Sequence, residues 1–103
     1  PAQLLVELLR NDETTEVMSA DEMAEAWRVV FEAEADRQNF PRAEDALFAS
    51  LELADWPEPL VRRGIRFYER LEELPDDLLE RRGLPRTEVA EALAELTARL
   101  GGN

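Results

Sequence analysis

The sequence predicts a mainly α protein: a single domain over residues 1–103, with four to five helices in a compact bundle and an N-terminal β-hairpin. Three observations lead to this class. Proline and glycine divide most of the chain into segments of helical length, and each segment repeats apolar residues three or four positions apart. In addition, the hydrophobic content of 45% is ordinary for a globular chain, and a length of 103 residues is enough for one core. The hairpin makes the predicted fold α+β, and the alternative is an all-α fold.

Residues 1–18 allow two interpretations. As strands, the segments QLLVELLR and TTEVMS flank a polar turn and form a hairpin. As a helix, the first segment carries an equally good apolar stripe, formed by Leu4, Leu5, Leu8 and Leu9. The β-branched residues of the second segment favour strands, so we predict the hairpin. Because an isolated hairpin is marginal, it would need the helices beneath it or a second hairpin from another chain.

Residues 19–100 are expected to be helical. The first helix begins at Ser19, which stands three residues before Glu22 as in a capping box, and it runs to about Arg37. Its large apolar residues recur at helical intervals, so we expect this set to face the core: Met23, Trp27, Val30 and Phe31.

Prolines mark the start of the next two helices. Pro41 fits the first turn of a helix that ends near Asp55, because an amide in the first turn has no helical acceptor to lose. By the same argument Pro57 and Pro59 belong at the start of a third helix. Both helices have an apolar side, with Leu47, Phe48, Leu51 and Ala54 in one and Leu60, Val61, Ile65, Tyr68 and Leu71 in the other.

A short fourth helix opens after Pro75 and ends at Gly83. The acidic residues at its start and the arginines at its end suit the helix dipole. The last helix begins at Pro85 or Thr87, and its apolar residues are Val89, Leu93, Leu96 and Leu100. Residues 101–103 are expected to fray as a tail.

The composition argues against catalysis. The chain has no His, no Cys and no Lys, so it lacks the imidazole, thiolate and amine that many enzymes use as base, nucleophile or metal ligand. Ser19 and Ser50 have no such group to activate them. We therefore predict a protein that is not an enzyme and that has no catalytic residue, no cofactor and no metal site. The alternative is an enzyme that works with carboxylates and Mg²⁺, or with Pro1 as an N-terminal base.

Acidic charge is concentrated in the first half of the chain. The net charge is −12, from 24 acidic and 12 basic side chains, and most of the excess lies in residues 1–55. On the first predicted helix four carboxylates share the face opposite the apolar residues: Asp21, Glu25, Glu32 and Asp36. We predict that this face binds a basic partner. The alternative is a solvated face that keeps the protein soluble.

Arginines cluster on one side of the third predicted helix, at Arg62, Arg63, Arg66 and Arg70. Like charges this close repel one another unless something anionic faces them. Glu58, Glu69 and Glu73 lie three or four residues from these arginines, so pairing within the chain is sufficient to explain the cluster. The alternatives are self-association with a second copy and binding of an external anion.

These observations predict a small acidic protein-binding module. It would be a regulator or adaptor, such as an inhibitor, an immunity or antitoxin-like protein, or an assembly factor, that docks on a basic partner surface. The alternative is an inhibitor that mimics nucleic acid. Direct binding of nucleic acid is disfavoured by the negative charge. No segment resembles a leader or a membrane helix, so we expect a cytoplasmic protein without a membrane partner. Complementary charges and the hairpin edge predict a homodimer.

Overall fold

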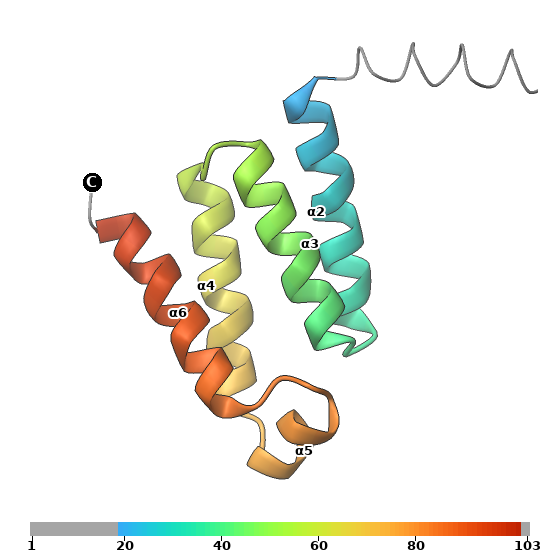
Figure 1. The fold of residues 1–103 in the computed structure, drawn as a ribbon, viewed down its shortest axis with the longest axis vertical. Coiled ribbons are helices and arrows are strands. Elements are labelled where there is room, and N and C mark those ends of the chain that lie inside the picture. The colour runs from blue at the N-terminus through green and yellow to red at the C-terminus, as the bar shows by residue number, and fades with distance from the viewer. Residues whose placement is uncertain (1–18, 102–103) are drawn as a thin grey trace, which may run out of the picture.

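The computed structural model describes residues 19–101, and within that range every regular element is a helix (Figure 1). The helices are α2 (Ala20–Asp36), α3 (Phe40–Leu53), α4 (Glu58–Glu72), α5 (Asp76–Arg81) and α6 (Arg86–Gly101). The mainly α prediction is confirmed. The hairpin predicted for residues 1–18 lies outside the described residues. So does most of the predicted tail, although α6 runs through Gly101, one residue past the predicted helical range.

The helices form two antiparallel pairs that lie next to each other (Figure 1). α2 packs along α3, α4 packs along α6, and α3 meets α4 between the pairs. The short helix α5 lies at one end of the second pair, beside α6. The order across the molecule is therefore α2, α3, α4 and α6, which places α2 and α6 at the two edges.

Helix starts follow the predicted rules. The Ser19 hydroxyl accepts a hydrogen bond from the Glu22 amide at 3.1 Å, and the Glu22 carboxylate accepts one from the Ser19 amide at 3.0 Å, so the capping box is complete. Pro57 and Pro75 are the N-cap residues of α4 and α5. Pro41 lies in the first turn of α3. The three predicted proline starts are thus confirmed.

Three helices end in the same way, with a residue of positive φ after the last turn and a backbone bond back to the helix. Gly83 (φ 82°) ends α5, and the amide that follows it donates to the Leu79 carbonyl at 3.0 Å. Gln38 (φ 62°) and Asp55 (φ 61°) end α2 and α3 with equivalent bonds. Glycine reaches positive φ without strain. Of these three helix ends, the one at Gly83 is therefore the one that the residue type predicts.

A single core joins the two helix pairs. Phe67 of α4 makes edge-to-face contacts with Phe31 of α2 and Phe40 of α3, at ring-centroid distances of 5.1 and 6.2 Å. Tyr68 adds a third such contact at 5.0 Å. The other buried apolar residues in the cluster are Ala43, Ala46, Leu47, Leu51, Val61, Leu71, Leu79, Leu84, Val89, Ala92 and Leu96.

The first helix does not bury the apolar set that its spacing predicts. Phe31 is fully buried, but Met23, Trp27 and Val30 are 38%, 43% and 42% exposed, so that part of the prediction is wrong within residues 19–101. At about 100° per residue the apolar residues of α2 span roughly two thirds of its circumference. Its neighbour α3 covers the side of Ala24 and Phe31. Because an edge helix packs along one neighbour, no residue of 19–101 covers the rest of its apolar surface.

Candidate functional site

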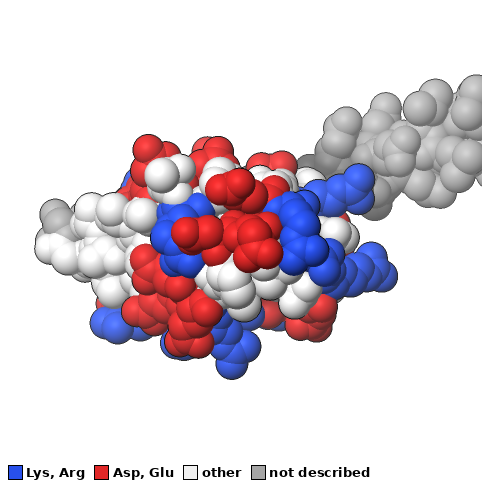
Figure 2. Space-filling model, turned by 90° about the horizontal axis from the view of Figure 1, so that it is seen from below, with Lys and Arg blue, Asp and Glu red and all other residues white. Residues whose placement is uncertain are grey.

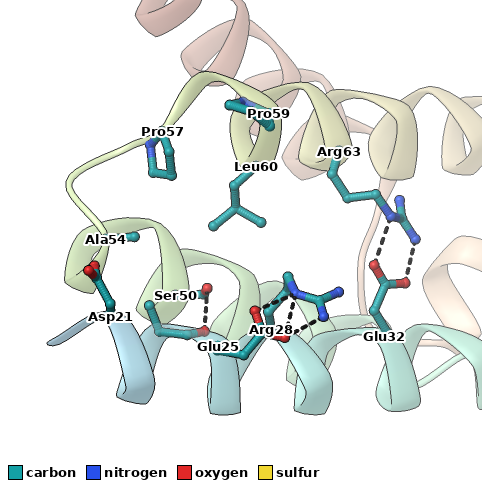
Figure 3. Close-up of a pocket in the computed structure, with 11 residues that line it drawn as sticks. Asp21, Glu25, Arg28, Glu32, Ser50, Ala54, Pro57, Pro59, Leu60 and Arg63 are labelled. Atoms are coloured by element: carbon teal, nitrogen blue, oxygen red, sulfur yellow. Dashed lines mark hydrogen bonds and ion pairs between the residues drawn. The ribbon is translucent and has the colours of Figure 1, made fainter. Parts of the chain in front are cut away.

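Three of the four carboxylates predicted to bind a partner line one cleft between α2 and α4. The cleft has a volume of about 390 Å³. Asp21, Glu25 and Glu32 lie on its α2 side (Figure 3). Asp36 lies apart, in a separate hollow that Arg70 also lines. The predicted acidic face is therefore divided between two surfaces.

The inner surface of this cleft is largely apolar. Ala24 lines it from α2. Leu60 lines it from α4, with Pro57 and Pro59 at the start of that helix (Figure 3). The buried hydroxyl of Ser50 donates to the Ala24 carbonyl at 2.7 Å and so ties α3 to α2. The hydroxyl of Ser50 is therefore buried at the cleft with its hydrogen bond satisfied.

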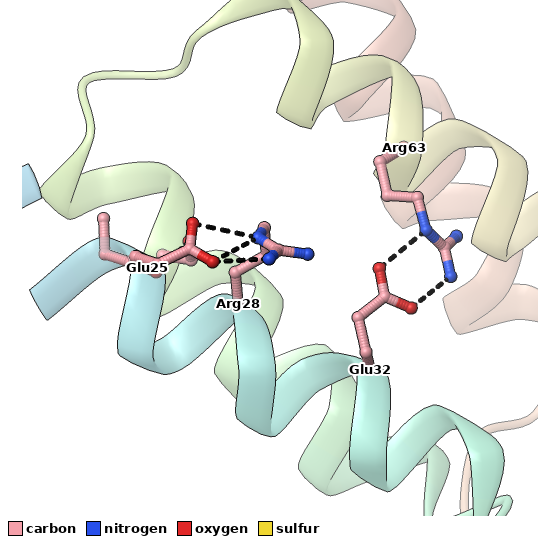
Figure 4. A network of polar contacts seen from close by, with 6 residues as sticks. Glu25, Arg28, Glu32 and Arg63 are labelled. Carbon is pink, nitrogen blue, oxygen red and sulfur yellow. Dashed lines mark hydrogen bonds and ion pairs between the residues drawn. The ribbon is translucent and has the colours of Figure 1, made fainter. Parts of the chain in front are cut away.

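The charges on the rim of the cleft are paired with one another (Figure 4). Arg28 donates to Glu25 one turn away, which lowers the pKa of the Glu25 carboxyl and raises the pKa of the Arg28 guanidinium. Arg63 reaches from α4 to Glu32 and donates two bonds, at 2.9 and 2.7 Å. Its guanidinium carbon lies 5.0 Å from the centre of the Phe31 ring. Two of the three carboxylates in the cleft thus have a cation of their own.

The arginine cluster of α4 contains two arginines that form ion pairs and two that form none within residues 19–101. Arg62 pairs with Glu58 at 2.9 Å and Arg63 pairs with Glu32, so pairing within the chain is confirmed for these two. Arg66 and Arg70 form no ion pair with any residue of 19–101. Self-association and anion binding through this cluster stay predictions, and they would rest on these last two arginines.

Acidic and basic side chains are interspersed at the end of the molecule that holds α5. Figure 2 shows this end, where carboxylates and arginines adjoin one another. Asp76 pairs there with Arg86, and Asp77 pairs with Arg81 at 3.6 Å. Exposed pairs of this kind contribute little stability and leave little net charge to attract a partner.

A groove between α3 and α6 collects carboxylates that have no cation. We call it the carboxylate groove; its volume is about 340 Å³ and its charged residues are Glu44, Asp45, Glu88, Glu91 and Glu95. Phe48 and Ala92 form its apolar part. None of the five carboxylates forms an ion pair within residues 19–101. Among the described residues, this groove therefore gathers five carboxylates whose charge no arginine compensates.

Glu44 shows how the carboxylates affect one another. Burial raises the pKa of its carboxyl, and a hydrogen bond from the Tyr68 hydroxyl, at 2.6 Å, opposes that rise. The nearby charges of Glu88 and Asp45 raise the pKa further. The pKa of Tyr68 is raised as well, by burial and by its bond to Glu44. An ionised Glu44 is therefore held in the groove at a cost in stability.

Replacing Glu44 by glutamine should stabilise the protein at neutral pH. Because the folded state raises this pKa, it binds the proton more tightly than the unfolded chain, and the contribution of Glu44 to the free energy of unfolding falls as the pH rises above about 4.5. Glutamine is uncharged and can still accept the Tyr68 bond. We expect a gain of about 0.5 kcal/mol at neutral pH and none near pH 3, where both side chains are neutral.

Thermal melts of Glu44→Gln and the parent at the two pH values measure this difference. The control is Glu52→Gln, which removes an exposed α3 carboxylate outside the groove and should change neither melt. A lower melting temperature for Glu44→Gln at neutral pH would contradict the assignment.

The carboxylate groove offers chemistry for recognition, since it combines anions with an apolar surface. In residues 19–101 no three His, Cys, Asp or Glu side chains come together in a way that could hold a metal ion. Over the same range, no helix has both the length and the apolar character that crossing a membrane requires.

The sequence pattern reveals one side of this groove and not the other. Glu88, Glu91 and Glu95 recur at helical spacing, which places them on one face of α6. Nothing in the pattern singles out Glu44 and Asp45, because adjacent acids are common on a helix surface. The tertiary fold alone brings the acidic sides of α3 and α6 to one groove.

Comparison with known proteins matches the chain to one protein family. No curated protein matches the chain, and no solved structure does. One family model matches residues 2–101, which is nearly the whole sequence. The chain therefore belongs to the Family of unknown function (DUF6483).

Proposed function

We propose that this protein is a small acidic, non-catalytic protein-binding module, a regulator or adaptor, and that its carboxylate groove receives a basic segment of a partner protein. The observation that carries the proposal is the set of five carboxylates in the groove, none of which is paired with a cation within residues 19–101. Like charges held this close repel one another. A cationic partner relieves that repulsion when it binds. The groove therefore attracts a cationic ligand more strongly than a neutral or anionic one.

The groove also suggests the form of the partner. Phe48 and Ala92 lie among the carboxylates, so the best ligand is an apolar side chain flanked by Arg or Lys. A groove bordered by two helices suits an amphipathic segment of this kind. Because much of the attraction comes from exposed charges, association should be fast at low salt and weaker at high salt.

The cleft between α2 and α4 is a poorer site for such a partner. Glu25 and Glu32 each have an arginine of the same chain beside them. A cation of the partner would have to displace Arg28 or Arg63, and it would lose the energy of those pairs. We therefore place the binding surface on the carboxylate groove rather than on the acidic face of α2.

Neutralising the α6 side of the groove tests the proposal. The variant carries Glu88→Gln, Glu91→Gln and Glu95→Gln, and the probe is a fluorescein-labelled amphipathic helical peptide with leucines on one face and arginines beside them. At about 0.5 kcal/mol for each charge, the variant should bind the peptide roughly tenfold more weakly than the parent at low salt. Fluorescence anisotropy gives the two dissociation constants.

A matched variant separates the groove from net charge. Glu69→Gln, Glu72→Gln and Glu73→Gln remove three exposed carboxylates of α4 and its C-cap, and they change the net charge by the same amount. This variant should bind the peptide within about twofold of the parent. Equal weakening by both variants, or no weakening by the α6 variant, would refute the proposal. Circular dichroism confirms that both variants keep the helical fold.

A further inference from the structure

The helix α2 exposes an apolar face that no residue of 19–101 covers. Its large side chains are 38–55% exposed, at Met23, Trp27, Val29 and Val30. Ala26 and Ala33 are exposed on the same side of the helix. Contiguous exposed apolar surface marks a contact with another segment or molecule. This face lies apart from the carboxylate groove, which α3 and α6 form.

We propose that residues 2–18 of the same chain cover this face, with the segment QLLVELLR packed against Trp27 and Val30. The family model that matches the chain begins at residue 2, so one family model spans both this segment and the helices. The segment is covalently attached at the start of α2, and a tethered ligand has a high effective concentration at a site it can reach. The proposal is independent of the function proposed for the carboxylate groove.

The residues around the start of α2 have the sequence pattern of a motif that would bring the preceding chain to this face. Ser19 has an extended backbone (φ −70°, ψ 160°) and a complete capping box, so α2 begins there. Met18 stands immediately before the N-cap, and Met23 is the fourth residue of the helix. Hydrophobic residues at these two positions often pack together, in the motif called a hydrophobic staple. Because Met23 belongs to the exposed apolar face, a staple brings the chain to that side of α2.

The segment also has a suitable length and composition. Its leucines recur at helical spacing, at Leu4, Leu5, Leu8 and Leu9. In helical form, residues 3–10 would be about 12 Å long, close to the roughly 10 Å along the axis between Met23 and Val30. Residues 11–17 can extend to about 23 Å, which is enough to reverse the direction of the chain. The leucines can therefore reach the whole face.

The fluorescence of Trp27 shows directly whether residues 2–18 cover the apolar face of α2. In the full chain with Trp56→Phe, Trp27 is the sole tryptophan, and a second variant also changes the four leucines to serine. We expect the leucine changes to raise acrylamide quenching of Trp27 by at least about twofold and to shift its emission to the red, as an aromatic ring loses its apolar cover.

The same leucine changes in a Trp27→Phe chain give the matched control. The remaining tryptophan, Trp56, lies against Phe48 and beneath the Arg99 guanidinium, so its quenching should stay the same. No change at Trp27, or equal changes at both tryptophans, would overturn the proposal.

A spin label distinguishes this chain from a second copy. Glu7→Cys introduces the sole cysteine, and the attached label should broaden the amide NMR signals of residues 23–33 but not those of 88–100. In a mixture of labelled unenriched chains and unlabelled ¹⁵N-enriched chains, the signals of residues 23–33 should stay sharp. Broadening in that mixture would assign the face to the segment of a second copy and would overturn the proposal.

Discussion

Replacing Phe67 by alanine is expected to lower the free energy of unfolding by about 4 kcal/mol. The ring is 5% exposed and contacts Phe31 of α2 and Phe40 of α3, so it joins the two helix pairs. Truncation loses the burial of the ring and leaves a cavity where three helices meet, which they cannot fill without moving. Because a domain of this size has about 5–15 kcal/mol of stability in total, the melting temperature should fall by roughly 20 °C.

Urea and thermal unfolding measure this effect, and Phe48→Ala is the control. Phe48 is partly buried and makes one ring contact, to Trp56, at 5.8 Å. Its truncation should cost about 1.5 kcal/mol, because less surface is exposed and solvent can occupy the space. If the two substitutions cost the same, Phe67 does not join the pairs in the way described.

Replacing Gly64 by valine is expected to cost about 3 kcal/mol. A Cβ atom at this position would lie 2.8 Å from Leu96 Cδ1 and 3.0 Å from Leu47 Cδ2. Both leucines are fully buried, so they have little room to move away. Valine adds two further methyl groups at the point where α3, α4 and α6 meet. The gain in helix propensity over glycine, less than about 1 kcal/mol, is too small to offset this clash.

The matched substitution is Gly101→Val, at a helical glycine where nothing lies within 4 Å of an added Cβ. It should change the free energy of unfolding by less than about 0.5 kcal/mol. Chemical unfolding of both variants tests the comparison. Gly64→Ala should fall between them, because it adds one carbon atom and gains helix propensity. A Gly64→Val protein as stable as the parent would show that the helices can move apart freely.

The helix boundaries could be predicted because the interactions that set them are local. The capping box at Ser19 and the ending at Gly83 involve backbone groups within about one turn. The endings at Gln38 and Asp55 use the same geometry without glycine. Because neither residue is a glycine, the residue type at these two positions does not predict the ending.

The candidate site was less predictable, because it depends on contacts between residues that are far apart in the sequence. The acidic face of α2 follows from helical spacing, but Glu32 is paired with an arginine 31 residues away. Glu44 lies among carboxylates contributed largely by α6. Which carboxylates keep a cation depends on which helices lie side by side, and so the search for a basic partner moves from α2 to the carboxylate groove.

By itself, the sequence determined the helical class, the starts of α2 to α5 to within about a residue, the excess of negative charge and the lack of imidazole, thiol and amine side chains. The tertiary structure decided which apolar residues are buried and which charges are paired. Trp27 and Phe31 have the same helical periodicity, yet one is 43% exposed and the other is fully buried. Periodicity and capping depend on neighbours within a turn or two, whereas burial and ion pairing depend on the helices that pack alongside.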